Sequence, residues 1–358
     1  MQTALGLARR GLGDVWPNPA VGCVLVKDGR VVGRGWTATG GRPHAETRAL
    51  AQAGEAARGA TAYVTLEPCS HHGQTPPCAE ALIAAGVVRV VAAVEDPDRR
   101  VSGRGLARLR QAGLIVESGL CAEAASEVNA GFFQRIGCGR PLVTVKMATS
   151  LDGRIATHGG DSKWITGEAA RAAGHRLRAE ADAILIGSGT AMIDNPELTC
   201  RLPGMEHRSP LRLVVDGHLR LPLTSKLVAT ARKVPTWILT RTGNNPERID
   251  IMTDCGIEVI ELPTGPEGMV DLSAALQNLG KRGLTRILVE GGAHLSAALF
   301  RHDLVDRLAW FRAPILLGGD ALPAAVSFGV DHLNQAPRFS RLSVAEMGGD
   351  IFEYLTKD

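Results

Sequence analysis

Apolar and polar residues in the first third of the chain recur with periods that predict strands alternating with helices. Two β-rich runs, 20–26 and 30–36, flank Lys27-Asp28-Gly29, a strong signal for a type I′ hairpin turn. Helical spacing continues from His44 to Ala53, and Gly54 provides a stop signal. The other elements expected here are helices at 3–12, 78–85 and 103–112 and strands at 62–66, 87–94 and 114–117. Such alternation predicts an α/β layered domain with a mostly covered sheet.

The same alternation resumes after a short break in composition at Gly137-Cys138-Gly139-Arg140-Pro141. The strands expected beyond it are 142–147, 183–186, 211–215, 236–239, 257–262 and 285–289, and the helices are 168–181, 272–281 and 293–300. No internal repeat or low-complexity tract interrupts this pattern. Because 358 residues exceed a usual single domain, we predict two α/β domains, residues 1–139 and 140–358.

Composition narrows the classes of function. Lys+Arg 40 against Asp+Glu 37, with no basic run, gives no electrostatic footprint for nucleic acid, and 4% aromatic residues offer few platforms for base stacking. No apolar run approaches the roughly 18 residues that a membrane helix needs, and the N-terminus does not resemble a signal peptide. Seven scattered cysteines favour a reducing compartment over a disulfide framework. We therefore expect a soluble cytoplasmic enzyme without nucleic-acid or membrane partners.

One imidazole, two thiols and a carboxylate form the most informative group of side chains in the sequence. His44 and Cys78 fall in predicted first helical turns and Cys69 at a strand end, where the positive helix ends favour a thiolate. A catalytic Zn²⁺ takes three protein ligands and leaves its fourth position to water, whose pKa falls to about 7. The sequence thus predicts Zn²⁺ bound by His44, Cys69 and Cys78, with Glu46 as the proton carrier.

Zinc nucleobase deaminases carry a similar group of residues, His-x-Glu followed by Pro-Cys-x-x-Cys. Here the second half is stretched to Cys69-x8-Cys78. A structural zinc would need a fourth ligand, and His71 and His72 are the nearby candidates, although a substrate-facing role suits them better. Two cysteines can also be small core residues. Asn18, in a loop between two prolines, is either an ordinary turn residue or an amide that faces the pocket.

Two glycine-containing turns in the second half follow predicted buried strands. Glu290-Gly291-Gly292 joins a strand directly to a helix, and 186–190, Ile-Gly-Ser-Gly-Thr, ends another strand in the same manner. Glycines let backbone N–H groups approach a phosphate at a helix N-terminus, but they also serve close packing. Neither turn is Gly-x-Gly-x-x-Gly, so a Rossmann site is not supported. Their coexistence favours phosphate or cofactor binding.

Charged residues in the second half invite separate interpretations. Lys146 lies in an apolar β-run and needs a partner, for which Glu290 is the natural candidate. Arg178 is expected to be a solvated helix charge unless a phosphate is near. The segments 150–154 and 194–201 read as ordinary turns on spacing alone.

These motifs together resemble the family of bacterial bifunctional riboflavin-biosynthesis deaminase/reductases. In the first half the resemblance lies in Pro43-His44-Ala45-Glu46 and in the run 65–78. In the second half it lies in Ser150-Leu151-Asp152-Gly153-Arg154, Trp164-Ile165-Thr166, Gly189-Thr190, Asp194-Asn195-Pro196 and Val289-Glu290-Gly291-Gly292. It covers essentially the whole chain, and the long spacing between the two cysteines is highly specific.

The resemblance implies a cytidine-deaminase fold that hydrolyses the 2-amino group of 2,5-diamino-6-(5-phosphoribosylamino)pyrimidin-4-one. It also implies a dihydrofolate-reductase fold that uses NADPH to reduce the ribosyl group to ribityl, and that binds its dinucleotide without the Rossmann fingerprint. By matching motifs, the NADPH contacts would be Ala148, Trp164, Thr190, Asp194 and Gly292. The contacts to the pyrimidine ribotide would be Lys146, Ser162, Arg178, Leu198, Arg201 and Glu290. Self-association through the reductase half is a further expectation from the family.

Two departures from the family pattern lie where the deaminase would grip its substrate. Thr37 stands where many relatives carry a histidine, and Asp96-Pro97-Asp98-Arg99 replaces an Asp-Pro-Asn-Pro run. Two other hypotheses compete with the bifunctional enzyme. A nucleic-acid deaminase would show Cys-x-x-Cys spacing, a basic surface and many aromatic residues, and the sequence offers none of the three. A non-catalytic phosphoribosyl or nucleotide sensor would keep zinc only for folding.

Overall fold

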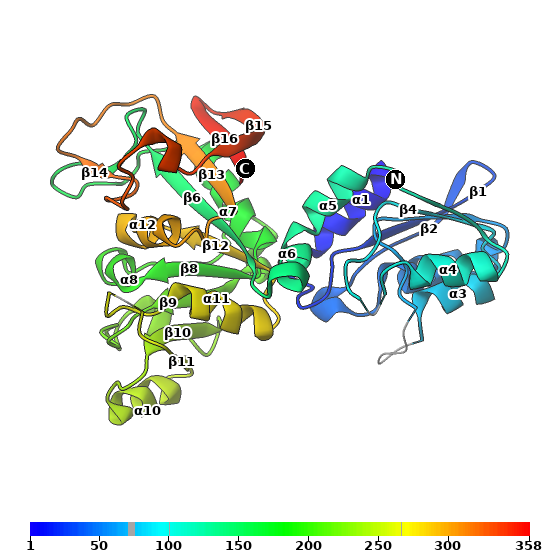
Figure 1. The fold of residues 1–358 in the computed structure, drawn as a ribbon, viewed down its shortest axis with the longest axis horizontal. Helices are drawn as coiled ribbons and strands as arrows, with labels where there is room; N and C mark the ends of the chain where they lie inside the picture. Colours follow the sequence, from blue (N-terminus) through cyan, green and yellow to red (C-terminus); the bar gives the residue numbers. More distant parts are fainter. Residues whose placement is uncertain (71–75, 100, 266) are drawn as a thin grey trace. The chain divides into compact units, whose positions relative to one another are not determined.

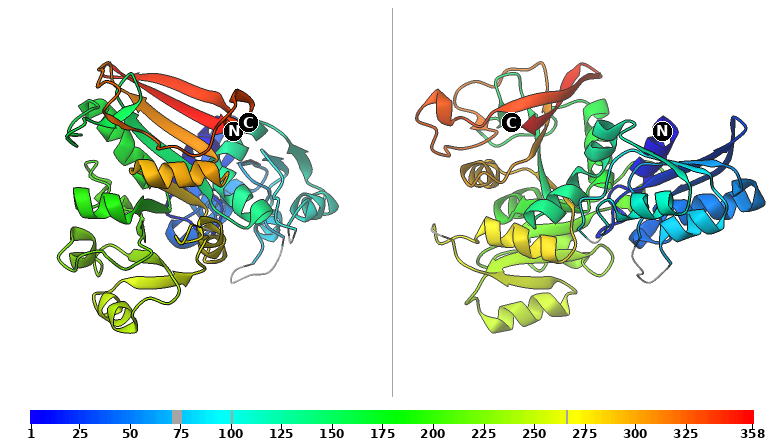
Figure 2. Two further views of the ribbon diagram at one scale, coloured as in Figure 1. Left: turned by 60° about the vertical axis from the view of Figure 1, so that its left-hand side comes forward. Right: turned by 45° about the vertical axis from the view of Figure 1, so that its right-hand side comes forward.

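A computed structural model describes residues 1–70, 76–99, 101–265 and 267–358. The chain forms two compact units, Met1–Arg140 and Pro141–Asp358, drawn in blue to cyan and in green to red in Figure 1. Two further views appear in Figure 2. None of the described helices has the length and apolar character required to cross a membrane.

The first unit is built on a five-stranded sheet with the order β2-β1-β3-β4-β5. Its strands are β1 Gly22–Lys27, β2 Arg30–Trp36, β3 Thr61–Val64, β4 Arg89–Ala92 and β5 Ile115–Ser118. β1 is antiparallel to both of its neighbours, whereas β3, β4 and β5 are parallel. The predicted hairpin is confirmed, and its turn residues Asp28 and Gly29 have the positive φ angles that a type I′ turn requires, 49° and 73°.

Helices cover both faces of this sheet. They are α1 Gln2–Ala8, α2 Ala45–Ala53, α3 Cys78–Ala84, α4 Arg104–Gln111, α5 Ala122–Val128 and α6 Ala130–Cys138, with 3₁₀ turns η1 Arg9–Gly11, η2 Thr39–Gly41 and η3 Gly54–Ala57. The helix expected at 3–12 thus ends as a 3₁₀ turn, and Pro77 is the N-cap residue of α3. α5 and α6 were not anticipated.

Glycines in the β1–β2 hairpin allow two helices to approach closely. A Cβ atom on Gly22 would lie 1.9 Å from the carbonyl oxygen of Ala4 in α1, and one on Gly35 would lie 2.1 Å from that of Ala45 in α2. Gly35 pairs with Cys23, the neighbour of Gly22, so the two glycines face opposite sides of the sheet. α1 and α2 therefore pack on opposite faces, and α2 is fixed directly on the strand backbone.

The second unit contains a nine-stranded sheet with the order β11-β10-β9-β8-β12-β6-β13-β16-β15. Its strands are β6 Leu142–Thr149, β8 Ala183–Gly187, β9 Leu211–Val215, β10 Thr236–Arg241, β11 Glu258–Leu262, β12 Arg286–Glu290, β13 Arg307–Arg312, β15 Phe339–Met347 and β16 Asp350–Lys357. The strands from β11 to β13 are parallel, and β16 and β15 are added antiparallel. A separate pair joins β7 Arg154–Ala156 and β14 Leu322–Pro323. The C-terminal strands were not predicted.

The helices of this unit follow the parallel strands. They are α7 Glu168–Glu180, α8 Ser188–Asp194, α9 Lys226–Ala229, α10 Pro246–Asp254, α11 Leu272–Lys281 and α12 Ala293–Arg301, with 3₁₀ turns η4 Glu206–Arg208 and η5 Leu333–Gln335. Because β8, β12 and β6 are adjacent and parallel, their carboxyl ends meet at one edge of the sheet. Glu290 and Lys146 are direct partners in the register of β12 and β6. This register aligns the two residues that the sequence analysis expected to pair.

Candidate functional site

His44, Cys69 and Cys78 converge in the first unit. Their ligand atoms all lie within 4.8 Å of one another, with His44 Nδ1 3.3 Å from Cys78 Sγ and 3.7 Å from Cys69 Sγ. His44 caps α2, Cys78 begins α3, and Cys69 follows β3. The backbone N–H of Cys78 donates to Cys69 Sγ at 3.3 Å. One imidazole and two thiols at this spacing fit the donor set that tetrahedral Zn²⁺ prefers.

The charges around these residues also favour a cation. Burial of Glu46, which is 3% exposed, raises the pKa of its carboxyl to about 7, and negative charge on Cys69 acts in the same direction. The hydrogen bond with Cys78 lowers the pKa of the Cys69 thiol to about 4, assisted by His44. The Cys69 hydrogen bond in turn raises the pKa of His44. A partly buried thiolate at Cys69 beside the buried carboxyl group of Glu46 makes a site that a divalent cation neutralises.

Glu67 joins this site to the segment that follows β4, a role that sequence reasoning missed. Its buried carboxylate accepts four backbone hydrogen bonds. The donors are the N–H groups of Asp96 at 3.2 Å, Gly103 at 2.9 Å, Gly105 at 2.8 Å and Leu106 at 3.2 Å. Glu67 thus holds the two ends of the segment that runs from Asp96 into the first turn of α4 beside the strand end that delivers Cys69.

The structure shows where the two departures from the family pattern, Thr37 and the segment 96–99, lie. Thr37 is buried, and its hydroxyl accepts a hydrogen bond from Val21 N at 3.0 Å and donates one to Pro19 O at 3.1 Å. It therefore braces the backbone of the loop that carries Asn18. Asp96 and Asp98 are also buried, and Asp98 N donates to Asp96 Oδ1 at 2.9 Å, whereas Arg99 is exposed.

The sequence left the roles of Asn18, His71 and His72 undecided. A Cβ atom on Gly41 would lie 1.9 Å from Asn18 Nδ2, so the amide lies against the turn that precedes His44. The structure therefore places Asn18 next to the segment that delivers His44. His71 and His72 lie outside the described residues.

Arg178 and Glu290 form the centre of the second group. Arg178 Nε and Nη2 donate to the two Glu290 oxygens at 2.6 and 2.8 Å, and Arg178 Nη1 donates to Thr199 O at 3.0 Å. Lys146 Nζ lies 4.0 Å from Glu290 Oε2. The predicted pairing of Lys146 with Glu290 is confirmed, but the interpretation of Arg178 as a solvated charge is wrong. Its side chain is 15% exposed because α7 turns this face toward β12.

The charge of Glu290 follows from these contacts. Burial alone would raise the pKa of its carboxyl, but the charges of Arg178 and Lys146 outweigh burial and hold it at about 2. α7 comes close enough that a Cβ atom on Gly174 would lie 3.9 Å from Lys146 Cε. A carboxylate and two cations are thus assembled at the carboxyl end of β12, where Glu290 pairs with Lys146 of β6.

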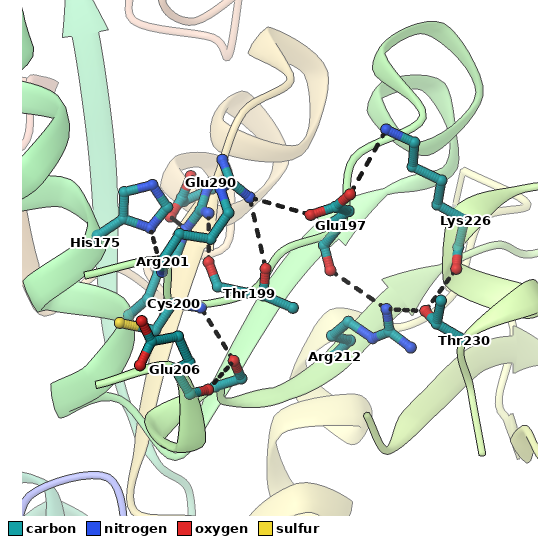
Figure 3. Close-up of polar contacts among 12 residues, drawn as sticks. His175, Glu197, Thr199, Cys200, Arg201, Glu206, Arg212, Lys226, Thr230 and Glu290 are labelled. Carbon is teal, nitrogen blue, oxygen red and sulfur yellow. Dashed lines mark hydrogen bonds and ion pairs between the residues drawn. The ribbon is translucent and has the colours of Figure 1, made fainter. Parts of the chain in front are cut away.

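His175 and Arg201 extend this group (Figure 3). Arg201 N donates to His175 Nδ1 at 3.3 Å, and Arg201 Nη1 lies 3.6 Å from Glu197 Oε2. Burial lowers the pKa of His175, and the positive charges of Arg178 and Arg201 lower it further. Sequence reasoning missed His175, and its spacing from Arg178 on one helical face was the available signal.

The two glycine-containing turns meet in the folded second unit. Gly291 and Gly292 have φ angles of 76° and 83°, and a Cβ atom on Gly292 would lie 2.9 Å from Thr190 Oγ1. Thr190 therefore packs directly against the Gly-Gly backbone. The remaining residues of the predicted set occupy several segments: Ala148 on β6, Ser162 and the exposed Trp164 before α7, the exposed Asp194 at the end of α8, and the buried Leu198 in the loop that follows.

Comparison with known proteins identifies the family. The model described as RibD C-terminal domain matches residues 141–352, and the cytidine and deoxycytidylate deaminase zinc-binding region matches residues 1–94. The chain belongs to the RibD family. Riboflavin biosynthesis protein RibD of Bacillus amyloliquefaciens is 42% identical over 98% of this chain and 94% of its own length. The protein of the same name from Escherichia coli (strain K12) is 42% identical over 99% and 98%.

Solved structures of RibD proteins agree over the whole chain. Acinetobacter baumannii RibD, form 1, has a TM-score of 0.88 at 39% identity, covering 100% of this chain and 97% of that one. The Thermotoga maritima diaminohydroxyphosphoribosylaminopyrimidine deaminase/5-amino-6-(5-phosphoribosylamino)uracil reductase has a TM-score of 0.86 at 32% identity, with the same coverage.

Family membership decides among the three sequence hypotheses. The chain is a bifunctional enzyme of riboflavin biosynthesis, with a zinc-binding deaminase region and a reductase domain that uses NADPH. The expected fold class is confirmed as an α/β chain with a cytidine-deaminase-like N-terminal domain and a dihydrofolate-reductase-like C-terminal domain.

Proposed function

We propose that residues 1–139 catalyse the hydrolytic deamination of 2,5-diamino-6-(5-phosphoribosylamino)pyrimidin-4-one, with Zn²⁺ held by His44, Cys69 and Cys78. The observation that carries this assignment is the convergence of the three ligand atoms within 4.8 Å beside the buried Glu46. Zinc with three protein ligands acts as a Lewis acid that brings the pKa of a water in its open position to about 7.

Glu46 is the proton carrier of this reaction. It lies in the first turn of α2, two residues from His44, and burial raises the pKa of its carboxyl to about 7. A group with that pKa can accept a proton from the attacking water and return it to the ring nitrogen and the departing ammonia at neutral pH. Glu67 supports the site through its bonds to the backbone of Asp96 and Gly103.

Residues 140–358 reduce the ribosyl group of the deaminated ribotide to ribityl with NADPH, which supplies the hydride. This assignment is supported by the assembly of Glu290, Arg178 and Lys146 at the carboxyl end of β12, beside the Gly291-Gly292 turn. The proposed NADPH contacts are Ala148, Trp164, Thr190, Asp194 and Gly292. The proposed ribotide contacts are Lys146, Ser162, Arg178, Leu198, Arg201 and Glu290.

Glu290, Lys146 and Arg201 have different roles in binding the ribotide. Arg178 keeps Glu290 ionised, so its carboxylate can accept hydrogen bonds from substrate hydroxyl or amide groups. Lys146 places an ammonium group beside that carboxylate and can donate to the substrate. Arg201 offers a guanidinium that is 52% exposed, which suits a phosphate.

Self-association through the reductase domain is also proposed. β15 forms one edge of the nine-stranded sheet and exposes Leu342 and Val344. An apolar sheet edge of this kind can pair with a second copy of the chain. Sedimentation velocity should show a dimer or larger species, and a monomer at all accessible concentrations would contradict it.

Two assays test the two activities separately. Glu46→Ala should retain zinc and stop releasing ammonia from the diaminopyrimidine ribotide, yet still oxidise NADPH when the deaminated ribotide is supplied. A variant that still released ammonia would remove Glu46 from the mechanism. The parent should oxidise NADPH with the deaminated ribotide, and failure to oxidise it with that substrate would contradict the reductase assignment.

A further inference from the structure

Residues 195–201, the first part of the loop between α8 and η4, have their shape imposed by groups outside the loop (Figure 3). Contacts recur at every second residue along the loop. Lys226 N donates to Asn195 Oδ1 at 2.8 Å, Arg212 Nη1 to Glu197 O at 3.3 Å and Arg178 Nη1 to Thr199 O at 3.0 Å, while Arg201 N donates to His175 Nδ1 at 3.3 Å. The loop is therefore held by side chains of α7 and β9 and by the start of α9.

The backbone of this loop needs such support. Leu198 has a φ of +55° although it carries a branched side chain, and it is buried. A non-glycine residue in the left-handed region costs on the order of 1 kcal/mol or more and persists only where its surroundings enforce it. The contacts at Glu197 and Thr199 flank this residue on both sides.

The contact made by His175 differs from those made by the arginines. Arg178 and Arg212 donate to carbonyl oxygens. His175 Nδ1 must accept from the Arg201 N–H, so the imidazole has to be neutral, with its hydrogen on Nε2. The lowered pKa of His175, caused by burial and then by Arg178 and Arg201, favours this form.

Of the two arginines proposed to contact the ribotide, the one that His175 holds, Arg201, has the larger hydrogen-bonding capacity left for a substrate. All three nitrogens of Arg178 are engaged by Glu290 and Thr199. Arg201 Nη1 makes long contacts, 3.6 Å to Glu197 and 3.5 Å to Thr199, and its side chain is 52% exposed. The position of its backbone therefore decides where a mobile guanidinium can reach.

We propose, resting on the ribotide role proposed for Arg201, that His175 is a positioning residue of the reductase site. Its Nδ1 fixes the Arg201 backbone and so sets the place from which the guanidinium meets the phosphate of the ribotide. His175 acts through Arg201 and does not contact the substrate.

Two substitutions test the roles of the two imidazole nitrogens separately. In His175→Asn the amide oxygen can take the place of Nδ1 and accept from Arg201 N, whereas His175→Gln carries its amide at the distance of Nε2. With His175→Ala and His175→Gln, the KM for the deaminated ribotide should rise about tenfold, because Arg201 loses the one hydrogen bond that positions its backbone. kcat and the KM for NADPH should stay within about twofold of the parent, and His175→Asn should restore the ribotide KM.

The controls distinguish the ways in which this could fail. His207→Ala, at an exposed histidine in η4, should leave all constants unchanged. Rescue by Gln instead of Asn would show that His175 contacts the substrate through Nε2 and would overturn the positioning role. An unchanged KM in His175→Ala beside a raised KM in Arg201→Ala would also overturn it, leaving the ribotide assignment intact. An unchanged ribotide KM in Arg201→Ala would contradict both the positioning role of His175 and the ribotide role of Arg201.

Discussion

Arg178 and Glu290, 112 residues apart in sequence, form two parallel hydrogen bonds of 2.6 and 2.8 Å between guanidinium and carboxylate. This geometry joins α7 to the end of β12 and leaves the third nitrogen of Arg178 to hold Thr199 O. A lysine could keep the charge but could not make both parallel bonds and the third contact together.

Arg178→Lys should therefore raise the ribotide KM by about tenfold and lower the unfolding free energy of the reductase domain by about 2 kcal/mol. Steady-state kinetics with the deaminated ribotide and urea denaturation would measure the two effects. Arg176→Lys is the matched control, because Arg176 lies on the same helix but is exposed and forms its ion pair with Glu180, one helical turn away. Equal effects at both positions would contradict the role given to the bidentate pair.

The lowered pKa of Glu290 predicts how its contribution depends on pH. The folded pKa of about 2 lies below the ordinary value of 4.5, so the stabilisation is complete above 4.5 and is lost as the pH falls toward 2. The difference corresponds to about 3 kcal/mol in a side chain that is largely buried. The gap in unfolding temperature between the parent and Glu290→Gln should be constant from pH 7 to pH 5 and narrow below pH 4.5, measured by calorimetry. A gap that did not narrow as the pH fell toward 2 would contradict the assigned ion pair.

Sequence motifs were sufficient to predict which residues converge in the first unit. His44, Glu46, Cys69 and Cys78 occur within one short stretch, and the helix starts and strand end that deliver them carry clear proline and glycine signals. Most of the parallel strands were predictable because they are short continuous apolar runs, such as Ala183–Gly187.

Other features depend on contacts that no local pattern reveals. The engagement of Arg178, and the roles of His175 and Glu67, arise from segments that meet only in the folded chain. β15 was not predicted from the sequence. Most of its residues are exposed, so the strand lacks the alternation of buried and exposed positions. α5, Ala-Glu-Ala-Ala-Ser-Glu-Val, carries too few large apolar residues to show a helical stripe.

The close packing of α2 on β2 predicts a severe effect of a single methyl group. In Gly35→Ala the new Cβ would lie 2.1 Å from Ala45 O and 2.7 Å from Ala49 N, which are backbone atoms of the helix that follows His44. The helix must shift, at a cost of about 3 kcal/mol, and the zinc site with it. We expect a lower unfolding temperature of the first domain and reduced zinc content by metal analysis.

Gly6→Ala supplies the comparison for this substitution. Gly6 lies inside α1, and a Cβ atom there would have no neighbour within 4 Å among the described residues beyond the backbone of its own helix. Alanine at this position should therefore be neutral or stabilising by up to about 1 kcal/mol. Full zinc content and unchanged stability in Gly35→Ala would show that α2 is not fixed by this contact.

Glu67 should be essential to the first domain through its four backbone acceptor bonds. Glu67→Gln replaces one acceptor oxygen with an amide that itself donates, so two of the N–H groups lose their partner. We expect a loss of on the order of 3 kcal/mol in the stability of that domain and a higher deaminase KM, with the reductase unchanged. Glu55→Gln, at an exposed position in η3, should have no effect. A stable Glu67→Gln enzyme with parental kinetics would refute this role.

Zinc content per chain tests the central assignment most directly. The parent, Glu46→Gln and the exposed-cysteine control Cys138→Ala should each contain about one zinc per chain by elemental analysis, whereas Cys78→Ala should contain almost none. Glu46→Gln should no longer release ammonia, although it retains its zinc. Full zinc occupancy in Cys78→Ala would contradict the account of the metal centre.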